Sequence, residues 1–144
     1  MSRNIGIRQP SGGLSALLAA RIIGVSFLWG IGATIFWIVG AFLLFGDPGV
    51  LNPLVLAFTF WGAILGLVAA GSHLLASFAV GKVLPGLPRD ILSAAIGWGV
   101  ALALWFALFL AGMDITMVIG SVIGAGVGAI LNFSAVRIHP PSGA

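Results

Sequence analysis

The sequence predicts an all-α integral membrane protein, built as one bundle of four transmembrane helices. Three observations predict it. Four long apolar runs occupy most of the 144 residues, 60% of the residues are hydrophobic against 6% charged, and the basic residues fall in alternate segments between the runs. A soluble globule of this composition would lack polar surface to face water. We therefore expect a single membrane-embedded domain.

Each apolar run is long enough to cross a bilayer. The predicted spans cover about 22–45, 53–80, 91–112 and 115–136, and a hydrocarbon core of roughly 30 Å requires about 20 helical residues. Backbone groups in lipid need partners within a helix or a closed barrel, and the runs lack the polar alternation of barrel strands. The predicted organisation is a flexible or interfacial tail at 1–13, the four-helix domain at 14–138 and a short tail at 139–144.

The charged residues predict the orientation of the chain. Basic residues precede the first run, separate the second from the third, and follow the fourth: Arg3, Arg8, Arg21, Lys82, Arg89 and Arg137. Asp47 and Asp114 occupy the two other connections, which contain no basic residue. Because Lys and Arg are retained on the cytoplasmic side, both termini are expected in the cytoplasm of a bacterial-type inner membrane. The basic residues form no dense cluster, which argues against nucleic-acid binding.

Acidic and amide residues beside the runs predict helix ends. Asn52 is a candidate cap for the second helix, with Pro53 in its first turn, where proline needs no hydrogen bond. Asp90 and Asp114 are candidate caps for the third and fourth helices. Capping is favoured over a catalytic role for both, because Asp suits a cap chemically. The short connection before Asp114 predicts an antiparallel hairpin of these two helices.

Small residues recur at every fourth position in two of the runs. They are Gly62, Gly66 and Ala70 in the second run, and Gly120, Gly124 and Gly128 in the fourth. Such stripes let helix backbones approach closely in lipid. We expect the second and fourth helices to pack together through them. The alternatives are that the stripes face a partner protein or a second copy, or that they receive a lipid or ligand.

The five tryptophans lie mostly within the runs, so an interfacial aromatic belt does not explain them. Trp98 and Trp105 are seven residues apart and share one helical face. They are candidates to line a lipid, quinone or pigment, or to pack on a partner helix. The competing interpretation is that large rings fill the spaces that glycine leaves.

His73 is the sole ionisable residue well within a predicted span, and such a residue is a functional candidate in a membrane protein. A neutral imidazole can ligate the metal of a haem or chlorophyll, donate to a quinone carbonyl, or bond to a neighbouring helix. Gly66 and Ala69 share its side of the helix and would leave room for a flat ring. Haem ligation within one chain generally needs a second histidine on a facing helix, whereas His139 is in the tail. His73 is thus the cofactor-binding candidate, a helix–helix hydrogen bond is its main alternative, and no metal site is predicted.

Catalytic motifs are missing from the sequence. There is no nucleophile elbow, phosphate-binding glycine loop or zinc helix motif, and there are no cysteines. Ser72 adjoins His73, but adjacent helical residues point about 100° apart and do not form a nucleophile–base pair. We expect a noncatalytic protein, with a composite site shared with another subunit left open.

The segments 77–82 and 132–137 end the second and fourth runs in the same way, with a small polar residue, Phe, three residues and a base. This pattern resembles the Asn-Phe and basic ends of the two halves of GtrA-like membrane proteins, a family implicated in moving polyprenyl-linked sugars. The resemblance covers these two exits and the four-span layout, and Ser77 stands where the family commonly has Asn. It implies a small transporter or flippase in which Lys82, Asn132 and Arg137 contact a polar headgroup.

Two functions follow as hypotheses. The first is an accessory, structural or assembly subunit of a larger membrane protein complex, because the chain has helix-packing surfaces, little mass outside the membrane and no visible chemistry. The alternative is the small transporter or flippase of a polar or lipid-linked substrate, with His73 as a further polar contact. The expected partners are the bilayer and other membrane subunits or a second copy. No cofactor is predicted, although a bound lipid, quinone or pigment is left open.

Overall fold

The computed structural model describes residues 16–46 and 53–138. Within them all regular structure is helical: α1 (Ala16–Phe45), α2 (Pro53–Val80), α3 (Leu87–Phe109), the short 3₁₀ turn η2 (Leu110–Gly112) and α4 (Ile115–Arg137). Each of the four α-helices is long and apolar enough to cross a membrane. This confirms the predicted all-helical class and the four helices of membrane-spanning length and hydrophobicity. The two predicted tails and the Asn52 cap lie outside the described residues.

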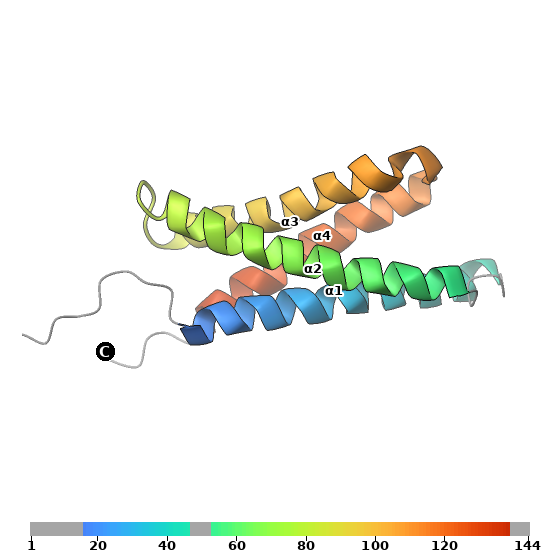
Figure 1. Ribbon diagram of the computed structural model, residues 1–144, viewed down its shortest axis with the longest axis horizontal. Coiled ribbons are helices and arrows are strands. Elements are labelled where there is room, and N and C mark those ends of the chain that lie inside the picture. Colours follow the sequence, from blue (N-terminus) through green and yellow to red (C-terminus); the bar gives the residue numbers. More distant parts are fainter. Residues whose placement is uncertain (1–15, 47–52, 139–144) are drawn as a thin grey trace, which may run out of the picture.

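The helices contact one another in chain order. α1 packs on α2, α2 on α3, α3 on α4, and α4 returns to α1 (Figure 1). Short connections make consecutive helices antiparallel neighbours, so this ring places α2 and α4 on a diagonal. The expected close pairing of the second and fourth helices is therefore wrong. The small-residue stripe of α2 contacts α1, and that of α4 contacts side chains of α1 and α3.

The predicted cap of the fourth helix is confirmed. Asp114 precedes α4, and its carboxylate accepts hydrogen bonds from the Thr116 hydroxyl at 2.6 Å and the Met117 backbone N–H at 2.8 Å. These two bonds stabilise the ionised form, so they hold the pKa of Asp114 below its usual value. The cap fixes the start of α4 directly after the connection from α3.

The predicted cap of the third helix is wrong. α3 begins at Leu87, before Asp90, and Gly86 precedes it with a φ of 79°. Glycine adopts this left-handed conformation without strain, and Pro88 fits the first helical turn because no N–H is needed there. Asp90 consequently lies inside the helix, where it is buried.

The buried residues of the bundle are mostly small or polar, whereas many of its exposed residues are large and apolar. Ala69, Trp98 and Ala101 form the buried hydrophobic cluster. Many large aliphatic and aromatic residues face outward, and Phe36, for example, is 79% exposed. Lipid gives little hydrophobic drive to bury such side chains, so close packing of small residues and hydrogen bonds hold the helices together.

Candidate functional site

The glycines of α2 bring two backbones into contact. A Cβ atom added at Gly62 would fall on the carbonyl oxygen of Gly30 in α1, and one added at Gly66 would fall on the carbonyl oxygen of Ser26. Ala70 continues the stripe and is buried. The sequence left three neighbours open for this stripe: another helix of the chain, a partner protein, or a lipid or ligand. The contacts of Gly62 and Gly66 are with another helix of the chain.

The glycines of α4 receive aromatic rings instead. A Cβ at Gly128 would overlap the indole ring of Trp98 from α3, and one at Gly120 would lie 3.2 Å from the indole ring of Trp37 in α1. Between them, Gly124 has Ala33 as its nearest neighbour, 3.9 Å from its Cβ position. At Gly120 and Gly128, indole rings rather than backbone therefore separate α4 from its neighbours.

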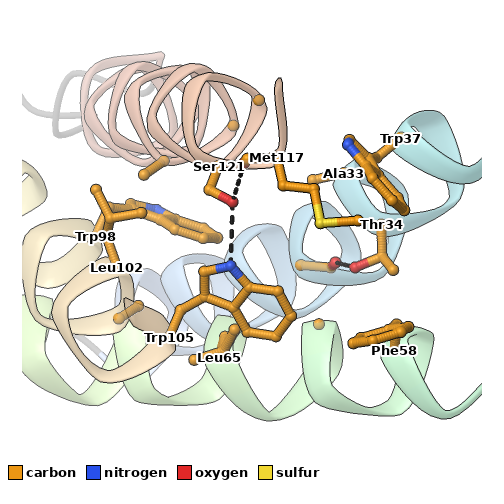
Figure 2. A pocket seen from close by; sticks show the side chains of 16 residues that line it. Ala33, Thr34, Trp37, Phe58, Leu65, Trp98, Leu102, Trp105, Met117 and Ser121 are labelled. Carbon is orange, nitrogen blue, oxygen red and sulfur yellow. Dashed lines mark hydrogen bonds between the residues drawn. The ribbon is translucent and has the colours of Figure 1, made fainter. Parts of the chain in front are cut away.

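A cavity of about 160 Å³ lies among these rings, in the half of the bundle where α3 connects to α4. All four helices contribute to its walls, and Figure 2 shows Trp98, Trp105, Phe58 and Trp37 arranged around it. Its other lining residues are Gly30, Ala33, Thr34, Gly62, Leu65, Ala101, Leu102, Met117, Gly120, Ser121, Gly124 and Ala125. Five of the eight predicted packing residues thus line one space: Gly62, Trp98, Trp105, Gly120 and Gly124.

The indole N–H groups near this cavity differ in their hydrogen bonding. Trp29 donates to the carbonyl oxygen of Gly124 at 2.8 Å, and Trp105 donates to the hydroxyl of Ser121 at 3.0 Å (Figure 2). Trp98 is only 6% exposed, yet its N–H has no hydrogen-bond partner among the described residues. This indole nitrogen is itself buried, so one donor inside the described bundle is unpaired.

A buried polar network lies towards the other end of the bundle. The Ser26 hydroxyl donates to the Asn132 carbonyl oxygen at 3.0 Å, and the Asn132 amide nitrogen lies 2.8 Å from the Ser26 hydroxyl and 3.3 Å from Nδ1 of His73. An amide nitrogen only donates, so Nδ1 accepts and a neutral imidazole carries its proton on Nε2. All three residues are almost completely buried. The network links α1, α2 and α4 inside the bundle.

The space beside His73 that the predicted cofactor would need is filled by neighbouring helices. Gly66, expected to leave room for a flat ring, is covered by the α1 backbone at Ser26. On the α3 side, a Cβ at Gly97 would lie 2.9 Å from the His73 Cβ. Among the described residues there is no group of three His, Cys, Asp or Glu that could hold a metal ion. The contacts of His73 match its alternative interpretation, a hydrogen bond between helices.

An ionic cluster connects the start of α3 to the end of α4. One carboxylate oxygen of Asp90 lies 3.1 Å from Nε of Arg89. The other lies 3.1 Å from a terminal guanidinium nitrogen of Arg137. Asp90 is 6% exposed, whereas the two arginine side chains are about one-third to one-half exposed. Two cations around one anion leave this end of the bundle net positive.

The residues predicted to contact a headgroup are placed differently from one another. Lys82 is exposed and lies over the ring of Phe78 at 4.7 Å, and Arg137 lies 5.9 Å from the ring of Phe133. Asn132 is fully buried, with its amide in the polar network. Its participation in headgroup contact would require the network to open.

Sequence reasoning missed two residues of these clusters. Ser26 joins the polar network, and Asp90 is the centre of the ionic cluster rather than a cap. A serine within an apolar run was a visible signal for the first. Nothing local to Asp90 indicates that Arg137 will reach it from another helix.

The cavity has flat aromatic walls, and a network of neutral polar groups lies on the far side of the Trp98–Gly128 contact. The hydroxyls of Ser26 and Ser121 take part in hydrogen bonds between helices. Comparisons of the chain with protein-family models, with curated proteins and with solved structures found no match.

Proposed function

We propose that this protein is a noncatalytic accessory or assembly subunit of a larger membrane protein complex. It resides in a bacterial inner membrane, with both termini in the cytoplasm. The observation that supports this function is a further ridge of small residues, on the outward face of α3. The ridge consists of Ala95, Gly99, Ala103 and Ala107, all of them exposed.

The two faces of α3 explain why the outward ridge supports a partner. A Cβ at Gly97 would lie 2.6 Å from the carbonyl oxygen of Ala69 in α2, whereas Gly99 has no atom within 4 Å of its Cβ position. Residues two positions apart lie about 200° apart around a helix, so these glycines are on opposite faces. The inward face already supplies the contact that the bundle needs. An outward face with the same character is suited to a further helix.

The surroundings of the ridge favour a helix as the partner. Ile96, Val100 and Leu104 lie beside it and are 36–43% exposed, so they form a raised border along the small residues. The connection between α2 and α3 spans only 81–86, and that between η2 and α4 only 113–114. Surfaces for a partner are therefore mostly within the membrane-spanning part of the described chain.

The matched test replaces one outward glycine on each of two helices. Gly99→Leu blocks the ridge of α3, whereas Gly126→Leu adds the same bulk on α4, where the glycine Cβ position is also open. Native mass spectrometry of the protein released from its own membranes in mild detergent measures the mass of the assembly. We expect Gly99→Leu to reduce it to the single chain and Gly126→Leu to leave it unchanged.

The assembly measurement also separates the two kinds of partner. A mass that is a multiple of this chain identifies self-association, and an added different mass identifies another subunit. A monodisperse single chain for the unmodified protein would contradict the proposal, as would an equal response to the two glycine substitutions.

A second candidate function is a small transporter or flippase of a polar or lipid-linked substrate. The buried network of Ser26, His73 and Asn132 favours it, because polar groups inside a membrane mark pathways for polar substrates. The resemblance of the two helix exits to GtrA-like proteins points the same way. Reconstituted vesicles should then move a fluorescent polyprenyl-phosphate sugar, and Asn132→Leu should slow the movement at least tenfold, while the outward-facing control Ile130→Leu should not. A rate equal to that of protein-free vesicles would exclude this function.

A further inference from the structure

We infer that an anionic phospholipid binds between α3 and α4, with its phosphate against Arg89 and Arg137 and one acyl chain in the apolar groove beside them. This lipid site goes beyond the proposed accessory role and shares only Ala95 with the outward ridge of α3. Two neighbouring features support it: a net positive ionic cluster at the helix ends, and an uncharged groove that begins one helical turn away.

The ionic cluster has hydrogen-bond donors left for a phosphate. A guanidinium carries five N–H donors, and Arg89 and Arg137 each use one nitrogen on the Asp90 carboxylate. This carboxylate is buried, whereas the two arginine side chains are 32% and 44% exposed. The planar fork of arginine matches the oxygens of a phosphate. The cluster can therefore bind an anion while both arginines stay paired with Asp90.

The arginines are held over the ends of three helices. A Cβ atom at Gly81, directly after α2, would lie 3.1 Å from Cδ of Arg89. Arg137 is the last residue of α4, and its guanidinium carbon lies 5.9 Å from the centre of the Phe133 ring. Phe133 also lines the groove. One aromatic ring thus joins the ionic cluster to the groove.

The groove runs between α3 and α4, away from the cluster and into the apolar part of the bundle. Its lining residues are all apolar: Ile91, Ala94, Ala95, Ala129, Ile130 and Phe133. The three from α4 lie four to eight residues before Arg137, which is about 6–12 Å along the helix axis at 1.5 Å per residue. Ala94 is buried, whereas Ile91 and Ile130 are more than half exposed, so the groove opens to the outside of the bundle.

The two features together select an anionic phospholipid over other occupants. A free phosphate would leave the groove unfilled, and a zwitterionic lipid would bring its own ammonium group close to two arginines. The headgroup of phosphatidylglycerol has the phosphate without that cation. Basic pockets between transmembrane helices bind such anionic headgroups. Charge at the helix ends with an apolar groove further in also follows the order of headgroup and chain in a bilayer.

The test compares two lipids that differ only in the headgroup. Dioleoyl phosphatidylglycerol and dioleoyl phosphatidylcholine are titrated separately into the purified, delipidated full-length protein in detergent. Native mass spectrometry measures the lipids bound to the single chain. We expect the first phosphatidylglycerol to bind about tenfold more tightly than phosphatidylcholine, because two arginines attract its phosphate and nothing in its headgroup repels them. Millimolar inorganic phosphate should not displace it, because the acyl chain holds the lipid in the groove.

Matched variants test the two halves of the site. Arg137→Gln should reduce the preference for phosphatidylglycerol to about twofold or less. Lys82→Gln removes the same charge after α2, where Lys82 lies over the Phe78 ring, and should leave the preference unchanged. Ala95→Leu fills the groove and should weaken binding several-fold, whereas Ala103→Leu, the same change further along the outward face of α3, should not. Helix content by circular dichroism verifies that each variant is folded.

Four outcomes would overturn the inference. Equal affinity for the two lipids would mean that the groove accepts any acyl chain, and displacement by inorganic phosphate would mean that the cluster binds an anion alone. Equal losses in Arg137→Gln and Lys82→Gln would assign a diffuse cationic surface, and equal responses to Ala95→Leu and Ala103→Leu would remove the groove from the site. Because lipid binding is measured on the single chain, its result does not depend on whether the outward ridge of α3 has a partner.

Discussion

The small-residue stripes of α2 and α4 have the same spacing but different neighbours. At Gly62 and Gly66 the backbone of α1 lies directly against α2. At Gly120 and Gly128 the neighbours are the indole rings of Trp37 and Trp98. The stripe of α2 allows two backbones to touch, and the stripe of α4 gives two indole rings a flat surface to pack on.

The difference teaches that glycine spacing indicates a ridge without indicating what covers it. The covering residue is set by the facing helix: α1 presents Gly30 and Ser26 to α2, but it presents Trp37 to α4. Backbone contact is dense, whereas rings that bridge a wider separation leave the cavity beside them. α4 is consequently held by individual side-chain contacts, and α2 by continuous packing.

The largest expected effect is at the backbone contact. Gly62→Ala places a methyl group on the carbonyl oxygen of Gly30 and on the hydroxyl of Thr34. Because the carbonyl cannot move without displacing a helix, we expect a loss of about 3 kcal/mol in the free energy of unfolding. Unfolding in mixed micelles of increasing dodecyl sulfate, followed by circular dichroism, measures it.

Gly124→Ala is the control for this substitution on the ring-bearing stripe. Its new methyl group would lie 3.9 Å from Ala33, an ordinary contact, so stability should stay the same or rise by up to about 1 kcal/mol from the better helix propensity of alanine. Equal losses at the two positions would erase the distinction between the stripes.

The next effect concerns the ionic cluster that joins α4 to α3. Asp90→Asn removes the anion between Arg89 and Arg137 and leaves two cations facing each other. The arginines are partly exposed, so solvent screens the loss to about 1–2 kcal/mol. The same micelle titration measures it, and high salt should shrink the difference from the unmodified protein. A salt-independent difference would point to packing rather than charge.

A smaller effect is expected for the tryptophan hydrogen bond between α3 and α4. Trp105→Phe and Ser121→Ala each remove the bond between the indole N–H and the hydroxyl, and each should cost about 1 kcal/mol. The double variant should cost less than the sum, because both changes remove the same interaction. Strict additivity in this cycle would mean that the hydrogen bond does not stabilise the packing of α4 on α3.

The smallest effect is the pH response of the Asp114 cap. Hydrogen bonds to its carboxylate hold the folded-state pKa of Asp114 below its ordinary value. A lowered pKa means that the cap stabilises α4 above the unfolded pKa and is lost as the pH falls through the folded value. Hydrogen exchange at the Met117 amide should therefore show no fraying of α4 near neutral pH and increasing fraying as the pH falls through the lowered pKa of Asp114. Asp114→Asn keeps a capping side chain that does not titrate, and should remove this pH dependence.

The sequence predicted those features that depend on local chemistry. The four spans follow from length and hydrophobicity, and the Asp114 cap depends on residues within its own turn. Features that depend on distant residues were missed. Asp90 is inside α3 because Gly86 and Pro88 start the helix earlier, and it is an ion-pair centre because Arg137 reaches it from α4.

The candidate site was predictable only in part. Trp98 and Trp105 were recognised as residues of one face, and both line the cavity. The cavity itself could not be predicted, because it depends on rings from α1 and α3 meeting a flat ridge on α4. His73 stood out as a polar residue in a span, but its partners Ser26 and Asn132 became visible only when three helices were placed together.

Cysteine cross-linking tests most directly whether the glycine ridge of α4 faces α1 of the same chain. The protein has no native cysteine, and the Cβ position of Gly124 lies 3.9 Å from that of Ala33, within the usual disulfide range of about 3.5–4.5 Å. The Ala33→Cys, Gly124→Cys double variant should form an intramolecular disulfide upon mild oxidation in membranes, detected by mass spectrometry as a monomer lighter by two hydrogen atoms. Disulfide-linked dimers with no intramolecular bond would contradict the account, because the ridge would then face another molecule.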